Sequence, residues 1–286
     1  MASTTFVRIG VAGRSVLLLA GFAFSGAAFS IDGVIEINQV RALRGGITTG
    51  DTAGFPVTIS APGSYRLTSN LDLRGEFSPQ NVTAINITGS NVSIDMNGFS
   101  IIGPATCTGT GATLACSPSG TGFGITTSGN PDNLTLRDGT IRGMGAGAVY
   151  LFGTKGALLS RLHVINNGDG ITLAAGSALL DSFVMYNKGV AAVLANGVDI
   201  TSVILRGNTI VGNFGAGISV NKGSVITGNS IVGNGGHGLD YTPGSGAGNN
   251  VLMGNNGGAA NPQTSGGSEI GLNVCDHSPN PSTACP

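Results

Sequence analysis

Charge is scarce in this 286-residue chain, because only 9% of its residues are Asp, Glu, Lys or Arg and its formal net charge is −1. Disordered chains combine high charge with few apolar residues, whereas 41% of these residues are hydrophobic, so we expect a folded protein. There is no extended basic run, and the balanced charge offers no electrostatic footprint for nucleic acid or an anionic membrane surface. Nucleic acid is therefore not an expected partner.

Aromatic residues and clustered metal ligands are also few. The chain has no Trp, and aromatic residues make up 5% of it. We find no closely spaced group of carboxylates that resembles a calcium-binding loop, so we expect no metal site and no cofactor. Sugar-binding faces usually offer aromatic rings. Among the four tyrosines, Tyr150 directly follows an aliphatic strand residue that is expected to be buried, so we expect its ring on the surface.

No apolar run is long enough to cross a bilayer. Val16 to Phe24 is the longest near the N-terminus, and it follows Arg8 and Arg14. Ala28-Phe29-Ser30 then suits cleavage before Ile31. We predict that residues 1–30 are a signal peptide, with a single membrane anchor as the alternative. The mature chain is then exported without a transmembrane segment, to the extracellular space, the periplasm or the cell surface.

Four cysteines are present, which allow three pairings. Proximity in sequence favours Cys107 with Cys116 and Cys275 with Cys285. Disulfides suit an exported chain, because the compartments outside the cytoplasm are oxidising. A metal site is the competing interpretation, but the spacing is not that of short Cys-x-x-Cys pairs, and His277 is the only imidazole nearby.

Glycine is abundant, with 50 residues, but it shows no strict three-residue period, which excludes collagen. A longer repeat is present instead. Seven segments align on an aliphatic residue, here called the anchor, which always follows Ala or Gly. Successive anchors are 21 to 25 residues apart, except for a first spacing of 40 that contains Cys107 and Cys116. The anchors are Ile85, Ile125, Val149, Ile171, Val193, Ile218 and Leu239. Such a period predicts stacked coils of short strands.

Asparagine recurs at matching positions of the later coils. The segment from Asn208 to Asn213 returns as Asn229 to Asn234, and again from Asn250 to Asn255. Equivalent residues of stacked strands lie about 4.8 Å apart. We therefore predict that Asn208, Asn229 and Asn250 stack, with amides that satisfy backbone groups of the turns.

The same pattern suggests a division of the chain. Residues 31–80 are expected to form an N-terminal cap and leading strands, with the segment from Val34 to Leu43 as a short helix or a strand. Residues 81–258 are expected to form the coils, and residues 259–286 a C-terminal loop or cap with a disulfide.

The segment Asn91-Val92-Ser93-Ile94-Asp95-Met96-Asn97-Gly98-Phe99-Ser100-Ile101-Ile102-Gly103, together with the Gly-Asn repeats after residue 207, resembles the secreted proteins of the pectate-lyase-like superfamily. The resemblance covers about residues 55–258. It implies an all-β fold, a single-stranded right-handed parallel β-helix. It does not imply one activity, because the superfamily contains lyases, hydrolases, epimerases, adhesins and members of unknown function.

Charged residues gather on the middle coils, between residues 137 and 188. Lyases of the superfamily neutralise a uronate carboxylate with calcium or a cation and remove a proton with Arg or Lys. By that resemblance, the candidate catalytic residues are Arg137, Arg161 and Lys155. The candidate substrate-binding residues are Tyr150, Asp169, Asp138 and Asp181. The alternative is a surface ladder of alternating charge with no catalytic role.

Three functions are compatible with these observations. The first is a secreted or surface β-helix that binds glycans or other surfaces, or serves as a rigid module, without catalysis. The second is a polysaccharide lyase or related carbohydrate-active enzyme, such as a glycoside hydrolase, that uses the charged middle coils on a polysaccharide. Calcium is a candidate cofactor only in that case. The third is an envelope or appendage component that assembles through bare strand edges.

Overall fold

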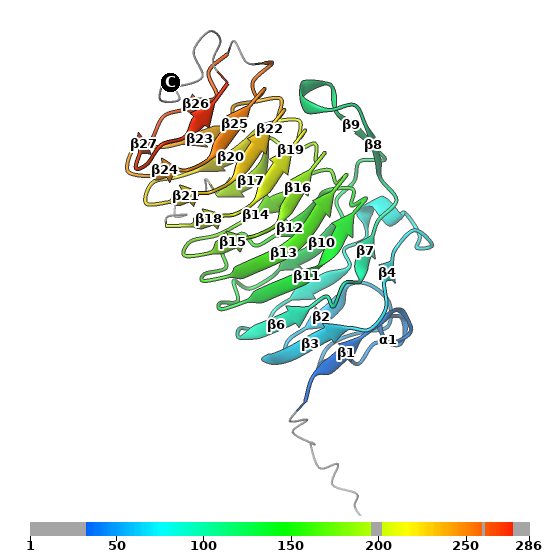
Figure 1. Cartoon of the computed structure of the whole chain (residues 1–286). Helices are drawn as coiled ribbons and strands as arrows, with labels where there is room; N and C mark the ends of the chain where they lie inside the picture. The colour runs from blue at the N-terminus through cyan, green and yellow to red at the C-terminus, as the bar shows by residue number, and fades with distance from the viewer. Residues whose placement is uncertain (1–32, 196–201, 259–260, 277–286) are drawn as a thin grey trace, which may run out of the picture. The chain divides into compact units, whose positions relative to one another are not determined.

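The computed structural model describes residues 33–195, 202–258 and 261–276. The predicted signal peptide lies outside these residues. Over these described residues the chain winds into a stack of coils whose strands run parallel to those of the next coil (Figure 1). The only α-helix of the described part is α1 (Gln39–Arg44), and there are two 3-10 turns, η1 (Pro79–Asn81) and η2 (Gly111–Thr113). The expected all-β parallel solenoid is confirmed.

One sheet, which we call sheet B, takes one strand from each coil. Its strands are β2 (Val57–Ile59), β5 (Ile85–Ile87), β10 (Phe123–Thr127), β12 (Gly147–Tyr150), β14 (Ile171–Thr172), β17 (Ala191–Ala195), β20 (Ala216–Val220), β23 (Leu239–Tyr241) and β26 (Thr264–Ser265). All seven predicted anchors pair in a single register. The register extends to Val57 before them and to Thr264 after them.

The other large sheet, sheet A, contains two rows of strands, so most coils have three strands, one in sheet B and two in sheet A. The first row is β1 (Ile35–Ile37), β3 (Gly63–Leu67), β6 (Val92–Asp95), β11 (Thr135–Arg142), β13 (Leu158–Ile165), β15 (Ala178–Leu180), β18 (Ile204–Arg206), β21 (Val225–Thr227), β24 (Gly246–Gly248) and β27 (Ser268–Glu269). The second row is β4 (Leu71–Asp72), β7 (Ser100–Ile102), β16 (Phe183–Met185), β19 (Thr209–Val211), β22 (Ser230–Val232), β25 (Val251–Met253) and β28 (Val274–Cys275). Strands β11 and β13 are long enough to belong to both rows.

The core lies between the sheets and consists of aliphatic columns. The anchors of sheet B are at most 2% exposed. The second row contributes a column in which Ile101, Ile141 and Val164 pair in register and are fully buried. Burial of each such side chain contributes about 1.5–3 kcal/mol to folding.

Lack of space explains the Ala or Gly before each anchor. A Cβ atom built on Gly124 would lie 2.5 Å from Cγ2 of Ile141 and 2.6 Å from the backbone oxygen of Ala148. On Gly217 it would lie 2.5 Å from Cγ2 of Ile231. Contacts this short are not tolerated, so Gly124 and Gly217 have no space even for a methyl group, whereas other coils accept Ala at the same position.

In the later coils, two corners are built by a residue with left-handed backbone followed by a buried residue. At the corner between the two rows of sheet A, Asp181 has a φ of 50° and Gly207 a φ of 69°. Asn208, Asn229 and Asn250 follow these corners, are at most 1% exposed and donate to one another along the stack, as predicted. A second ladder at the next corner runs through Asn167, Asn187, Asn213, Asn234 and Asn255.

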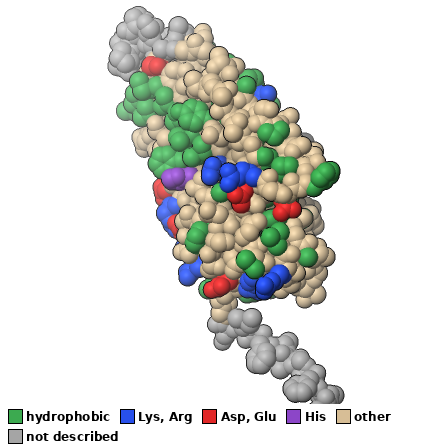
Figure 2. Space-filling model, turned by 90° about the vertical axis from the view of Figure 1, so that its right-hand side faces the viewer, with side chains coloured by type: hydrophobic (Ala, Val, Ile, Leu, Met, Phe, Trp, Pro, Cys, Tyr) green, Lys and Arg blue, Asp and Glu red, His purple; other side chains and the backbone are tan. Residues whose placement is uncertain are grey.

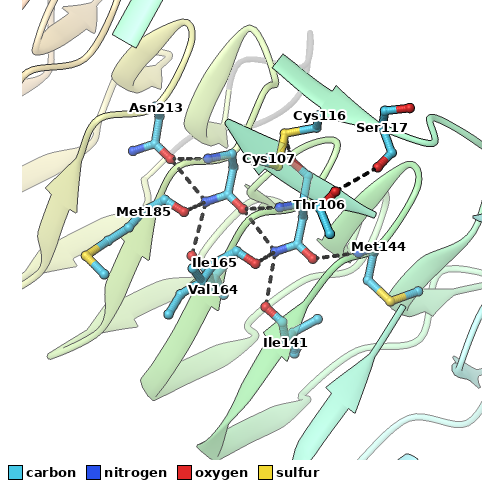
Figure 3. The surroundings of a disulfide bond; sticks show 12 residues. Thr106, Cys107, Cys116, Ser117, Ile141, Met144, Val164, Ile165, Met185 and Asn213 are labelled. Atoms are coloured by element: carbon cyan, nitrogen blue, oxygen red, sulfur yellow. Dashed lines mark hydrogen bonds between the residues drawn. A yellow bond between two sulfur atoms is a disulfide. The ribbon is translucent and has the colours of Figure 1, made fainter. Parts of the chain in front are cut away.

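The long spacing between the first two anchors contains a hairpin of β8 (Thr106–Thr108) and β9 (Ala115–Ser117), closed by the predicted disulfide between Cys107 and Cys116. The hairpin lies along the second asparagine ladder (Figure 3). Sγ of Cys116 is 3.7 Å from the backbone oxygen of Asn167, and the N–H of Gly111 donates to the oxygen of Gly212. The insertion therefore spans several coils. Cys275 is also disulfide-bonded, and Cys285 lies outside the described residues.

The N-terminal segment forms both elements that the sequence allowed, strand β1 and helix α1. The sequence spaces apolar residues three apart, at Val34, Ile37, Val40 and Leu43. These residues do not form one buried face, because Val40 and Leu43 are 57% and 47% exposed while Ala42 is buried. The reason is that β1 ends at Ile37, before the helix begins, so the spacing crosses two elements. Sheets A and B continue on both sides of the predicted 81–258 coil region, from β2 to β26 in sheet B.

Candidate functional sites on two faces

A row of alternating charge runs along the outer face of sheet A. Glu36, Arg66, Asp95 and Arg137 occupy successive coils in one register. Oδ2 of Asp95 is 2.9 Å from Nη2 of Arg137 and 3.5 Å from Nη2 of Arg66. Parallel stacking places these side chains about 4.8 Å apart, so opposite charges on neighbouring coils meet directly.

The row continues into the corner between the two rows of sheet A. Asp138 and Arg161 both have left-handed backbone there, which turns their side chains out of the coil. Nε and Nη2 of Arg161 donate to the two carboxylate oxygens of Asp138, at 2.5 and 2.8 Å, and Nη1 of Arg137 lies 2.9 Å from the same carboxylate. The hydrogen bonds from Arg161, assisted by Arg137, hold the pKa of Asp138 below its usual value.

Asp181 occupies the equivalent corner of the next coil, after Arg161, because Ser160 pairs with Leu180 and His163 with Phe183. Asp138 raises the pKa of the Arg161 guanidinium by hydrogen bonding, and Asp181 adds a smaller electrostatic contribution. The described residues show no ion pair between Asp181 and an arginine. Of these candidate residues, Arg137 and Arg161 therefore meet at Asp138, whereas Asp181 forms no ion pair with either arginine in the described part of the chain.

An open depression of about 410 Å³ lies over this corner. It is lined by Gly98, Asp138, Gly139, Thr140, Arg161 and His163. The imidazole of His163 is edge-on to the ring of Phe183, with ring centres 5.0 Å apart. Towards the C-terminus the outer face of the second row becomes apolar, and Figure 2 shows hydrophobic side chains gathered there, with charged ones towards the middle and N-terminal coils.

Chemically, the depression offers paired charges rather than an activated group. A proton-abstracting Arg needs a lowered pKa, whereas the pKa of Arg161 is raised. Lys155 lies elsewhere, at the turn between sheet B and the first row of sheet A, where its backbone N–H donates to Asp132. The three candidate catalytic residues thus do not share one site.

Tyr150 lies on the outer face of sheet B, and its side chain is 36% exposed, as its place after an anchor predicts. The ring of Phe123 stacks on it from the preceding coil with ring centres 5.0 Å apart, and the centre of the Phe152 ring lies 6.1 Å from that of Tyr150. Thr126 and Thr172 flank Tyr150 in register on the neighbouring coils. We call these three rings the aromatic platform.

Asp169 lies beside the aromatic platform. A Cβ atom built on Gly147 would touch both Cβ of Asp169, at 3.1 Å, and the ring of Phe123, at 3.3 Å. The carboxylate extends over Gly189 and accepts a hydrogen bond from the N–H of Gly170 at 2.8 Å. Burial raises the pKa of the Asp169 carboxyl, and the bond from Gly170 only partly opposes this.

A family model described as "Right handed beta helix region" matches residues 76–256, which is more than half of the chain. The chain belongs to the right-handed β-helix family. The match also confirms the handedness of the expected fold. Comparison with curated proteins gave no match, and comparison with solved structures gave none either.

The sequence of this β-helix did not predict that Phe123 and Phe152 are part of the platform. Phe123 lies two residues before an anchor, where Gly147 occupies the same position of the next coil and leaves space for the ring. That pairing of a large with a small residue in one column is the signal that could have identified the site. No group of three or more His, Cys, Asp or Glu side chains suited to a metal occurs among the described residues, and no helix there could span a membrane.

Proposed function

We propose that this right-handed β-helix is an exported carbohydrate-binding protein and that the outer face of sheet B binds the glycan. The aromatic platform carries the proposal. In a chain without Trp, Phe123, Tyr150 and Phe152 gather on one exposed face. Pyranose rings present apolar C–H faces, and aromatic rings bind such faces through large contact areas.

The surroundings of the platform support the same function. The hydroxyl group of Thr126 and the carboxylate of Asp169 lie on the neighbouring coils, where they can bond sugar hydroxyl groups. A few polar groups around an apolar surface are the usual composition of a ligand site. Export is supported by the signal-like residues 1–30 and by the Cys107–Cys116 disulfide, which suits an oxidising compartment.

The proposal is tested with the purified mature chain on a glycan array, followed by affinity electrophoresis in the polysaccharides that bind. We expect Tyr150→Ala to weaken binding about tenfold, which corresponds to the loss of one stacking contact. Phe77→Ala is the matched control, because Phe77 is 95% exposed and lies outside the platform. Equal loss in both variants, or no glycan bound by the wild type, would contradict the proposal.

A second candidate is a lyase acting on an acidic polysaccharide at the depression lined by Asp138, Arg161 and His163. Asp181 and Arg137 would then assist from the adjoining corner and strand. A screen of uronate polysaccharides for absorbance of the unsaturated product tests it, with and without calcium. Activity that survives Arg161→Ala would place the chemistry elsewhere, and activity that is absent under all conditions would leave the binding function.

A further inference from the structure

Asp169 is a half-buried carboxylate for which the described residues supply no opposite charge. It makes no ion pair, although Arg66, Arg74, Arg137 and Arg161 all do so elsewhere. Its hydrogen bond comes from the backbone of Gly170. Lys188, next to the Gly189 over which the carboxylate lies, forms no ion pair with it. A carboxylate in this position lowers stability unless something else compensates its charge.

The aromatic platform adds a second feature that favours a cation. Phe123 and Asp169 face each other across Gly147, and Phe123 in turn stacks on Tyr150. An ammonium group is attracted both to the faces of aromatic rings and to a carboxylate. Neutral sugars use only the platform, and uronates are repelled by Asp169.

We propose that the outer face of sheet B selects a glycan that contains amino sugars with free amines, and that Asp169 pairs with the ammonium group beside Phe123. This inference rests on the glycan-binding function proposed above and adds the class of glycan to it. The ammonium supplies the opposite charge that Asp169 lacks, while the next sugar ring stacks on Tyr150.

The probes are β-1,4-linked glucosamine oligomers and their N-acetylated counterparts, which differ in charge but share one backbone. We expect the wild type to bind the amine form about tenfold more tightly near neutral pH, as cation–π and ion-pair contacts in a partly desolvated site allow. Added salt should reduce this preference. Asp169→Asn should abolish it while binding of the N-acetylated oligomer is retained.

Asp240→Asn is the matched control. Asp240 is an exposed carboxylate on the same face, in the outward column of Tyr150 but several coils away, so the substitution removes the same charge outside the platform. The Asp240→Asn variant should prefer the amine form as strongly as the wild type does. Binding of the N-acetylated oligomer without preference for the amine overturns this inference and leaves the proposed function intact. Loss of preference in both variants also overturns it, and failure to bind any glycan overturns both.

Discussion

Single residues at the corners hold the coils in register. Asn229 is 1% exposed, and its amide donates to the backbone oxygens of Leu205 and Thr227 and to the side chain of Asn250. Its own side-chain oxygen accepts from the backbone and side chain of Asn208. Each ladder asparagine therefore supplies hydrogen bonds to backbone groups that water cannot reach at a buried corner.

We expect Asn229→Ala to lower the free energy of unfolding by about 2–3 kcal/mol, because it leaves buried donors and acceptors without partners. Urea denaturation followed by circular dichroism measures the change. Asn261→Ala is the control, since Asn261 is exposed and bonds only locally, and it should change stability by less than about 0.5 kcal/mol. Similar losses in the two variants would show that the ladder has no special role.

The sequence predicted the ladder of Asn208, Asn229 and Asn250 because these residues repeat at identical spacing. It did not predict the second ladder, although Asn213 and Asn234 are just as periodic. The reason is that the Gly-Asn pair occurs twice per coil, and only the three-stranded cross-section shows that both pairs turn corners. Ser182 occupies the ladder position of the preceding coil, where its N–H donates to Asn208. The positions of asparagine in the sequence therefore do not show where the first ladder begins.

At the scale of elements, close packing between strands of sheet B and sheet A decides which residues each coil accepts. The Ala or Gly before every anchor was visible in the sequence, but its cause lies in another sheet. Gly217 on β20 faces Ile231 on β22, and Gly124 on β10 faces Ile141 on β11. Such contacts join residues that are more than a dozen positions apart. The repeat therefore shows that the residue before each anchor is small, but it does not show which side chain of sheet A lies against it.

Gly217→Ala tests this packing. We expect a loss of about 1–3 kcal/mol of stability, because the new methyl group would lie 2.5 Å from Cγ2 of Ile231 and 2.7 Å from the oxygen of Gly238. Thermal or urea denaturation measures it. Gly75→Ala is the control, since a Cβ atom there meets no neighbour and the backbone is not left-handed. An unchanged Gly217→Ala variant would mean that the neighbouring strands move apart without cost.

At the scale of the whole solenoid, the three-stranded cross-section separates charges that are close in sequence. Arg137, Arg161 and Asp138 belong to the outer face of sheet A, whereas Tyr150 and Asp169 belong to that of sheet B. These residues are close in sequence, between residues 137 and 188, because they belong to successive coils. Each coil contributes strands to both sheets, so its charged residues lie on different faces. The coil period was predictable from the anchors. The face of each charged residue was not, because the corners do not have a fixed length.

The N-terminal end of the stack shows how the solenoid ends. Oδ1 of Asp51 accepts from the N–H of Thr58 at 2.7 Å, and the hydroxyl group of Thr48 donates to the oxygen of Thr58 at 2.7 Å. The side-chain amide of Gln39 donates to the backbone oxygen of Asp72 on β4 and accepts from its N–H. These bonds satisfy backbone groups on the sides of β2 and β4 that face away from the next coil. We propose that they cap the stack, as residues 31–80 were expected to do.

Unpaired strand edges invite pairing with another chain. The double variant Thr48→Val with Asp51→Ala should therefore self-associate more strongly than the wild type as concentration rises, while its circular dichroism remains that of a folded β protein. Size-exclusion chromatography with light scattering measures the mass. Asp132→Ala is the matched control, because Asp132 also accepts a backbone N–H, from Lys155, but at a corner between coils. If the double variant is folded and keeps the mass of the wild type at every concentration, then Thr48 and Asp51 do not protect the edge. A variant that unfolds is replaced by Gln39→Ala, which exposes the edge of β4 alone.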